Sequence, residues 1–282
     1  DILLVGGEGS NSVNRFRIGS NRMEKLPDLG LPSVVSVRDL VYVADAHGLF
    51  LIDPFSRCLI QATISEAALR QPAPRLEMRT FPLGAGPLRL LSVKDHLIVN
   101  LRLAHTLQII PLRRGFPDFS HATKISNDGP FWAVDARAWG RRLVIAAGGI
   151  ENRPLSRETG EFGYLDSFLY LFTLAQDQTG IYRWHESDRT DARRYRSINL
   201  SKRHVLTPKA ITLTDVGHGR ATAWVSGYGA DRLLTVDIGA KGMVAEREIG
   251  VMPGITDFVI TPPEPESSLV CVSPLLDRAV KR

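Results

Sequence analysis

The sequence predicts an all-β fold, specifically a β-propeller of six or seven four-stranded blades. A strand–turn–strand unit recurs six times, and each copy has an apolar run that ends in small residues, a polar turn and a second apolar run. A unit of this size cannot bury its own apolar face, so copies must pack on one another. The units begin at Ile2, Leu40, Leu97, Leu143, Thr222 and Leu269.

Strands on either side of these units complete the predicted blades. An apolar strand precedes every unit from the second onward, with the sequences PSVVSVR, LRLLSVK, FWAVDARAWG, AITLTDV and TDFVITP. A fourth, outer strand follows most units, as in CLIQATI and VAEREIG. Four antiparallel strands make one propeller blade. Apolar–polar alternation is weak in these strands, as expected where neighbouring blades cover both faces of a sheet.

We expect one propeller domain over residues 1–282, belonging to a longer chain. The first unit lacks its preceding strand and the last lacks its outer strand, so the ring is expected to be incomplete here, or closed in an unusual way. Three long segments are predicted as loops, at 66–83, 149–166 and 176–209. The second is our main candidate for a partner-binding or lid segment, and a decorative insertion is the alternative.

Composition narrows the class of protein. The apolar fraction is 44% and the charged fraction 23%, which is typical of a soluble globular protein, and no apolar stretch is long enough to span a membrane. The net charge is +5, and basic residues are densest between Arg183 and His204. Interspersed acidic residues favour a solvated loop there. A docking patch for an acidic protein is the alternative, and nucleic acid ranks third because no binding motif is present.

The two cysteines, Cys58 and Cys271, form no metal-ligand or redox pair by spacing. We predict two buried free thiols, with a disulfide between them as the alternative. The sequence has no Cys-x-x-Cys-His, so it carries no covalent c-type haem attachment site. No cofactor is expected in this chain.

The second and fifth units, VYVADAHGLFLIDPF and WVSGYGADRLLTVDI, resemble the YVTN-type β-propeller repeat. That repeat reads Val-Tyr-Val-small-Asn, a turn, then apolar-x-Val-Asp. The Asn is absent here, and Ala44, Ser226 and Ser273 stand near its place. The resemblance implies an exported, periplasmic bacterial protein. Some members of the family are fused or paired with c-type cytochromes or di-haem peroxidase-like domains, and others in the wider class hydrolyse sugar lactones.

Catalytic propellers carry polar side chains on turns at one end of a central channel. Alignment of the units predicts equivalent turn positions for Asn11 with Arg15, and for the channel-mouth candidates Asp45, His47, Arg102, His105, Tyr228, Asp231 and Arg232. If His47 and His105 met, they could act as bases or metal ligands. Separate histidines exposed to water are the alternative, because nothing in the spacing brings them together.

Other catalytic motifs are missing from the sequence. It has no His-x-His, no His-Glu-x-x-His and no Gly-x-Ser-x-Gly. Oxygen ligands for a divalent cation could come from Glu8, Asn100, Asp135 or Asp231, but any chain of this length offers as many. A metal site is therefore left unassigned.

Our leading hypothesis is a non-catalytic docking platform in an exported redox system, binding a c-type cytochrome or a di-haem peroxidase-like partner or fused domain. Any haem would then lie in that partner or in a missing domain. The expected contact residues are Glu151, Arg153, Arg157, Trp184, Arg193, Arg194 and Arg196, among which Trp184 is flanked by cations as at many interface anchors. Packing is the alternative for Trp184. The alternative function is a metal-dependent, lactonase-like hydrolase at the channel mouth, and a binding protein for a small ligand is a third possibility.

Overall fold

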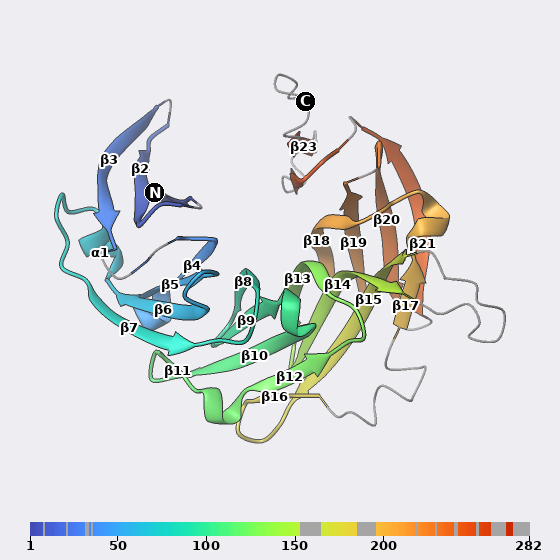
Figure 1. Ribbon diagram of the computed structural model, residues 1–282, viewed down its shortest axis with the longest axis horizontal. Coiled ribbons are helices and arrows are strands. Elements are labelled where there is room, and N and C mark those ends of the chain that lie inside the picture. Colours follow the sequence, from blue (N-terminus) through green and yellow to red (C-terminus); the bar gives the residue numbers. More distant parts are fainter. Residues whose placement is uncertain are drawn as a thin grey trace. The chain divides into compact units, whose positions relative to one another are not determined.

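Antiparallel sheets are the main secondary structure of the described chain in the computed structural model (Figure 1). The structure describes residues 1–7, 9–20, 22–31, 34, 36–152, 165–184, 196–217, 219–228, 230–239, 242–251, 254–260 and 269–272. The chain divides into two compact units, Asp1–Ile125 and Ser126–Arg282. The expectation of a single domain stays a prediction.

The first unit contains three antiparallel sheets in its described part. The first sheet has the order β1 (Ile2–Gly6), β2 (Ser12–Ile18) and β3 (Met23–Gly30). The second has the order β4 (Asp39–Val43), β5 (Gly48–Asp53), β6 (Cys58–Thr63) and β7 (Glu77–Pro82). The third has the order β8 (Pro87–Val93), β9 (His96–Leu101), β10 (Thr106–Arg113) and β11 (Phe116–Pro117), and β12 (Thr123–Ser126) also pairs with β10.

The second unit repeats this plan (Figure 1). One sheet has the order β13 (Phe131–Trp139), β14 (Arg142–Asn152), β15 (Leu165–Gln176) and β16 (Tyr182–Arg183), and β17 (Arg196–Asn199) also pairs with β15. The next has the order β18 (Pro208–Gly217), β19 (Arg220–Gly227), β20 (Arg232–Gly239) and β21 (Gly242–Gly250). The last pairs β22 (Asp257–Ile260) with β23 (Leu269–Val272).

Middle strands are buried on both faces, which explains the weak alternation in the sequence. All six residues of β5 and all six of β9 are buried. Successive side chains of a strand point to opposite faces. In β5, Leu49 and Leu51 join a core shared with the preceding sheet, whereas Phe50 and Ile52 join a core shared with the following one. Each sheet of the first unit is thus packed on its neighbour in the chain.

The second unit has cores of the same kind. Leu234 and Val236 of β20 pack with the preceding sheet, whereas Leu233 packs with Ile255 and Phe258 on the other face. The stacking of apolar faces predicted from the repeats is therefore present within each unit.

An aspartate links the first strands of consecutive sheets at two places, and it is buried in the second of them, at Asp135. Oδ2 of Asp39 in β4 accepts a hydrogen bond from the backbone N–H of Leu90 in β8, at 2.9 Å. Oδ2 of Asp135 in β13 accepts one from the N–H of Leu213 in β18, at 2.8 Å. Asp135 was a candidate metal ligand in the sequence, and here its carboxylate joins two sheets.

The predicted strands are largely confirmed. The first five units form the hairpins β1–β2, β4–β5, β9–β10, β14–β15 and β19–β20. The second strand of the sixth unit lies outside the described residues. Residues 66–83 are not a plain loop, because they hold the short helix α1 (Glu66–Leu69) and the outer strand β7. The segment 149–166 begins and ends as strand, since β14 extends to Asn152 and β15 begins at Leu165.

Arg15 is not a turn residue, because it lies in β2 and is completely buried. Its Nε donates to the carbonyl of Pro27 at 2.7 Å. Its Nη atoms donate to the carbonyls of Leu69, Gln71 and Pro72 at 2.7 to 3.0 Å. The guanidinium thus holds the segment after α1 against the first sheet.

Candidate functional site

The turns that carry His47 and His105 have the same local shape. A three-residue 3₁₀ turn, η1 (Ala44–Ala46), precedes His47, and a second one, η2 (Arg102–Ala104), precedes His105. Both histidines are in the left-handed region, with φ of 43° and 50°. This shared Ala-His ending is what makes the two turns equivalent in an alignment of the sequence.

Their places in the sheets differ. η1 joins the first and second strands of its sheet, β4 and β5, whereas η2 joins the second and third strands of the next, β9 and β10. A Cβ on Gly115, which follows β10, would lie 3.3 Å from the carbonyl oxygen of Ala46. Gly115 follows β10 and η2 precedes it, so they lie at opposite ends of that strand. Since η1 lies beside Gly115, η1 and η2 are at opposite ends of the sheets.

The structure therefore does not bring Asp45 and His47 together with Arg102 and His105. The alignment misassigned the second unit because residues 36–38, expected to be the first strand of that sheet, are not a strand, and β4 takes the first position instead. A shared imidazole site has no support in the geometry of the first unit.

The turn between β19 and β20 of the second unit carries the other channel-mouth candidates, and two of them pair with each other. Arg232 donates from Nε to Asp231 at 3.0 Å and from Nη1 to Glu248 at 2.8 Å. These bonds raise the pKa of Arg232, and the bond from Arg232 lowers the pKa of Asp231 below its ordinary value. Asp231 and Arg232 thus brace the start of β20, whereas Tyr228 is 46% exposed.

Tyr228 belongs to a cluster that we call the Lys209 site, made of Trp132, Lys209 and Tyr228. Nζ of Lys209 lies 4.6 Å from the centre of the Trp132 ring and 5.4 Å from the centre of the Tyr228 ring. Both distances are within the range of cation–π attraction. The ammonium group is held between aromatic side chains from two different sheets.

β-Bulges place two of these side chains. The pairing of β13 with β14 shifts between Phe131 and Ala133, so Trp132 is the extra residue. The pairing of β18 with β19 shifts between Pro208 and Ala210, so Lys209 is the extra residue. A bulge re-aims a side chain relative to the regular strand and is frequent beside active sites. The first strand of each sheet therefore presents its bulged residue to the same cluster.

Close backbone packing fixes the cluster. A Cβ on Gly148 of β14 would lie only 2.6 Å from Cβ of Pro208, so only glycine permits this approach of the two sheets. The N–H of Tyr228 donates to the carbonyl of Thr207 at 3.0 Å, which joins the turn after β19 to the start of β18. Sequence analysis assigned no functional role to Trp132 or Lys209.

Glu151 lies at the same end of β14. It follows Gly148 by three residues, a span of roughly 10 Å in a strand, and Gly148 packs on the neighbour of Lys209. The hydroxyl of Tyr170 donates to Oε1 of Glu151 and so positions this carboxylate. Because side chains alternate along a strand, Glu151 lies on the Tyr170 face of β14, opposite to the face of Gly148 that packs on Pro208.

No protein-family model and no curated protein matches the sequence. Solved structures similar to nearly all of the chain are β-propellers. The chain has a β-propeller fold. A functionally unknown protein from Desulfotomaculum acetoxidans aligns with a TM-score of 0.62 and 12% identity, over 96% of this chain and 72% of that one.

Two further propellers are lactonases by name. The Pseudomonas aeruginosa periplasmic gluconolactonase PpgL aligns with a TM-score of 0.55 and 15% identity, over 97% of this chain and 70% of that one. A candidate 6-phosphogluconolactonase from Bacteroides uniformis aligns with a TM-score of 0.52 and 12% identity, over 96% and 88%. At these identities the likeness shows the fold alone.

Most of the expected docking residues fall outside the part of the chain that the structure describes. Four of them fall outside the described residues, namely Arg153, Arg157, Arg193 and Arg194, and for Arg196 the structure describes only the backbone, in β17. Trp184 is 9% exposed and packs edge-on against Phe172, with ring centres 5.4 Å apart. The structure assigns Trp184 to packing, which leaves little of its ring for a partner.

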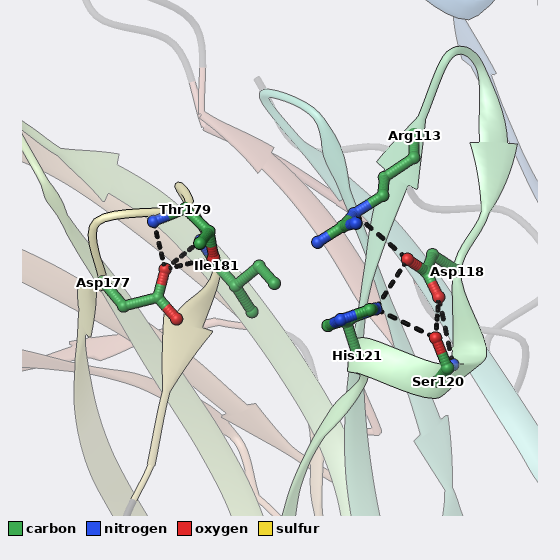
Figure 2. A network of polar contacts seen from close by, with 7 residues as sticks. All are labelled: Arg113, Asp118, Ser120, His121, Asp177, Thr179 and Ile181. Atoms are coloured by element: carbon green, nitrogen blue, oxygen red, sulfur yellow. Dashed lines mark hydrogen bonds and ion pairs between the residues drawn. The ribbon is translucent and has the colours of Figure 1, made fainter.

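A Ser–His–Asp set in the third sheet of the propeller has the composition of a catalytic triad but not its geometry (Figure 2). Nδ1 of His121 contacts both Oδ2 of Asp118, at 2.8 Å, and Oγ of Ser120, at 2.9 Å. A relay needs one ring nitrogen for each partner. Asp118 also pairs with Arg113, and the bond from Ser120 is the main cause that lowers the pKa of Asp118. The set stabilises a turn.

A second aspartate organises a turn in the second unit (Figure 2). Oδ1 of Asp177 accepts from the N–H and hydroxyl of Thr179 and from the N–H of Ile181, and Oδ2 accepts from Arg183. The bond from the Thr179 hydroxyl, followed by that from Arg183, holds the pKa of Asp177 far below its ordinary value. This carboxylate stays ionised and locks the β15–β16 turn.

Two other features are absent from the described residues, a metal cluster and a membrane-spanning helix. No group of three or more His, Cys, Asp or Glu side chains with the arrangement of a metal site occurs among the residues that the structure describes. Within the same residues, no helix is long and apolar enough to cross a membrane.

Proposed function

We propose that this propeller binds a small, oxygen-rich ring compound of the sugar-lactone class at the Lys209 site, and that it hydrolyses it. The observation that carries this proposal is the pair of β-bulges that presents Trp132 and Lys209 from neighbouring first strands. The equivalent bulge between β8 and β9 carries Leu88, so what distinguishes the bulges of the second unit is an ammonium group within cation–π distance of two aromatic rings. The proposal takes up the hydrolase alternative in preference to the docking platform.

The chemistry of the three side chains suits such a ligand. The faces of Trp132 and Tyr228 provide flat apolar surfaces against which the C–H face of a sugar ring can lie. The ammonium of Lys209 carries three N–H donors for carbonyl and hydroxyl oxygens. Its charge also favours a developing oxyanion, which is the usual route by which a site accelerates acyl transfer.

Hydrolysis of a lactone requires one water molecule. The water oxygen attacks the carbonyl carbon and gives a tetrahedral oxyanion, and the ring C–O bond then breaks to leave a hydroxy acid. In this scheme Lys209 stabilises the oxyanion, and the proton that the attacking water loses ends on the ring oxygen as that oxygen leaves. Divalent-metal dependence stays an open part of the proposal, and treatment with EDTA tests it.

Similarity to other proteins also supports the proposal, on two grounds. The chain shares its fold with a periplasmic gluconolactonase and with a candidate 6-phosphogluconolactonase. The resemblance of its second and fifth units to the YVTN-type repeat points to the same wider class. We propose export to the periplasm on the same two grounds. No comparison and no described contact favours a cytochrome partner.

The test is hydrolysis of gluconolactone and other sugar lactones, followed as acid release and corrected for the spontaneous rate. Lys209→Met keeps the length and packing of the side chain but removes the charge, and we expect at least a hundredfold loss of kcat. Trp132→Ala should mainly raise KM, because it removes a binding surface from ground state and transition state alike.

Lys124→Met is the matched control, since Lys124 is an exposed lysine of the first unit. It should leave the rate unchanged. Thermal melting of each variant separates loss of function from loss of fold. Wild-type turnover that survives Lys209→Met undiminished would overturn the site assignment. Absence of both turnover and lactone-dependent thermal stabilisation in the wild type would overturn the proposed function.

A further inference from the structure

Two large apolar side chains project into solvent from neighbouring turns of the first unit. Phe55, in the turn between β5 and β6, is 71% exposed, and Leu103, in η2, is 63% exposed. Each turn joins the second strand of its sheet to the third. Single exposed apolar residues are normal, whereas apolar residues that gather at one place mark interaction sites.

Hydrogen bonds to the carboxylate of Asp53 hold the turn of Phe55 in place. Oδ1 of the buried Asp53 accepts from the N–H of Phe55 at 2.9 Å and from the N–H of Ser56 at 3.1 Å. Oδ2 accepts from the Ser56 hydroxyl at 2.9 Å. An exposed ring on a fixed turn loses little conformational entropy when a partner covers it. The exposure of Phe55 is therefore built into the turn.

A short connector joins the two turns. The N–H of Leu83 donates to the carbonyl of Arg57 at 2.8 Å, and the N–H of Arg102 donates to the carbonyl of Gly86 at 2.8 Å. Leu83 and Gly86 are three residues apart, so they span at most about 10 Å. The turns of Phe55 and Leu103 thus lie at the same end of the first unit and within reach of one partner segment.

The charges around these turns are positive. Arg57 is exposed, and Arg102 is partly exposed beside Leu103. The aspartates described nearby face inward, because Asp53 holds its own turn and Asp39 joins β4 to β8. Phenylalanine and arginine are both enriched at protein–protein interfaces relative to the rest of the surface.

We propose that this Phe55–Leu103 surface docks an acidic segment of a partner protein, one that carries an apolar side chain between its carboxylates. Apolar contact with Phe55 and Leu103 would supply most of the affinity, and Arg57 and Arg102 would select the acidic partner. Single-stranded nucleic acid fits less well, because it requires several stacking rings and leucine has none. This surface is separate from the Lys209 site in sequence and chemistry, so the proposal does not depend on the lactone activity.

The experiment uses the full chain and an array of short synthetic peptides. One set places Leu, Phe or Trp among Asp and Glu, a second replaces the acidic residues by Lys and Arg, and a third replaces the apolar residue by Ser. We expect the wild type to bind the first set above the other two, and more weakly as salt is raised. Phe55→Ala and Leu103→Ala should each weaken binding at least tenfold.

Phe116→Ala is the matched control. Phe116 is a 38% exposed phenylalanine with the Arg79 guanidinium 4.4 Å from its ring centre, and it follows Gly115 at the other end of the sheets. It should leave peptide binding unchanged. Arg57→Asn removes a charge with a residue that tolerates the left-handed φ of 52° found there, and should weaken only the acidic set.

Three kinds of result would overturn the proposal. The first comes from the peptide array: either the wild type does not prefer acidic peptides, or Phe55→Ala binds them as tightly as the wild type does. The second is tighter binding of a labelled oligothymidine than of any peptide, which would assign the surface to nucleic acid. The third is a wild-type molar mass of a dimer by light scattering that falls to a monomer in Phe55→Ala, which would make a second copy the occupant.

Discussion

Oδ2 of Asp135 accepts a 2.8 Å hydrogen bond from the backbone N–H of Leu213 and so joins the first strands of two consecutive sheets. Oδ1 of the same carboxylate accepts from the N–H of Ala136 at 2.8 Å. In the first unit, Asp39 bonds Leu90 in the same way. A buried N–H without an acceptor is costly. These aspartates therefore satisfy backbone groups where one sheet packs on the next.

Removing the carboxylate of Asp135 should destabilise the second unit. Asp135→Ala leaves two buried N–H groups without their acceptor, at about 1–3 kcal/mol each. We expect a loss of about 2–6 kcal/mol in the free energy of unfolding, measured by urea denaturation. Asp237→Ala, at a half-buried carboxylate of the same unit, is the control and should cost less than about 1 kcal/mol. Equal losses for both variants would contradict a special role for Asp135.

The free energy of unfolding should vary with pH in the way that burial of the Asp135 carboxyl predicts. Burial raises the pKa of Asp135 above its ordinary value, against the opposing effects of the Leu213 N–H and of Arg137. A raised folded-state pKa means that the folded state holds the proton to higher pH than the unfolded state does. The associated stability is full below the unfolded pKa of about 3.9 and is lost as pH rises through the folded value.

The test compares wild type with Asp135→Asn, which cannot titrate at this position. The stability of the wild type relative to the variant should decrease as pH rises from about 4 through the folded pKa. Asp39→Asn should behave likewise, because burial is also the main cause that raises the pKa of Asp39. A difference that is flat with pH, or that grows as pH rises, would show that the carboxylate is not desolvated as described.

Arg15 should be the most sensitive arginine of the first unit. It is completely buried, and its guanidinium donates to four backbone carbonyls. Arg15→Met keeps the stem but leaves these acceptors unpaired, so we expect a loss of about 3 kcal/mol or more. Arg17→Met on the same strand is the control, because Arg17 is half exposed and its ion pair among the described residues is with Glu24 at 3.2 Å. Urea denaturation that fails to separate the two variants would contradict this assignment.

Much of the fold was predictable because apolar runs separated by turn-forming residues do form strands in the structure. Five of the six repeated hairpins were placed correctly for that reason. The position of a hairpin within its sheet was not predictable. The Ala-His endings before Gly48 and Thr106 give the same 3₁₀ turn whether the hairpin joins the first and second strands or the second and third.

The Lys209 site was harder to find than the fold. Trp132 and Lys209 are far apart in the sequence and meet because first strands of consecutive sheets pack together. A bulge has no periodic signature in an apolar run. One signal was present, since Pro130-Phe-Trp-Ala and Pro208-Lys-Ala both place an unexpected residue just before an alanine at the start of a first strand. Tyr228, by contrast, lay in a turn and was found from the sequence.

The thiol of Cys58 should be inert in the folded protein. It is 5% exposed and free, as predicted, and burial raises its pKa to about 11. At pH 8 the reactive thiolate is therefore scarce and shielded. In a Cys271→Ser background, which leaves one thiol, we expect the reaction with a disulfide reagent to be at least a hundredfold slower in native protein than in urea. Fast labelling of the native protein would mean that the core between the first two sheets opens readily, contrary to its close packing.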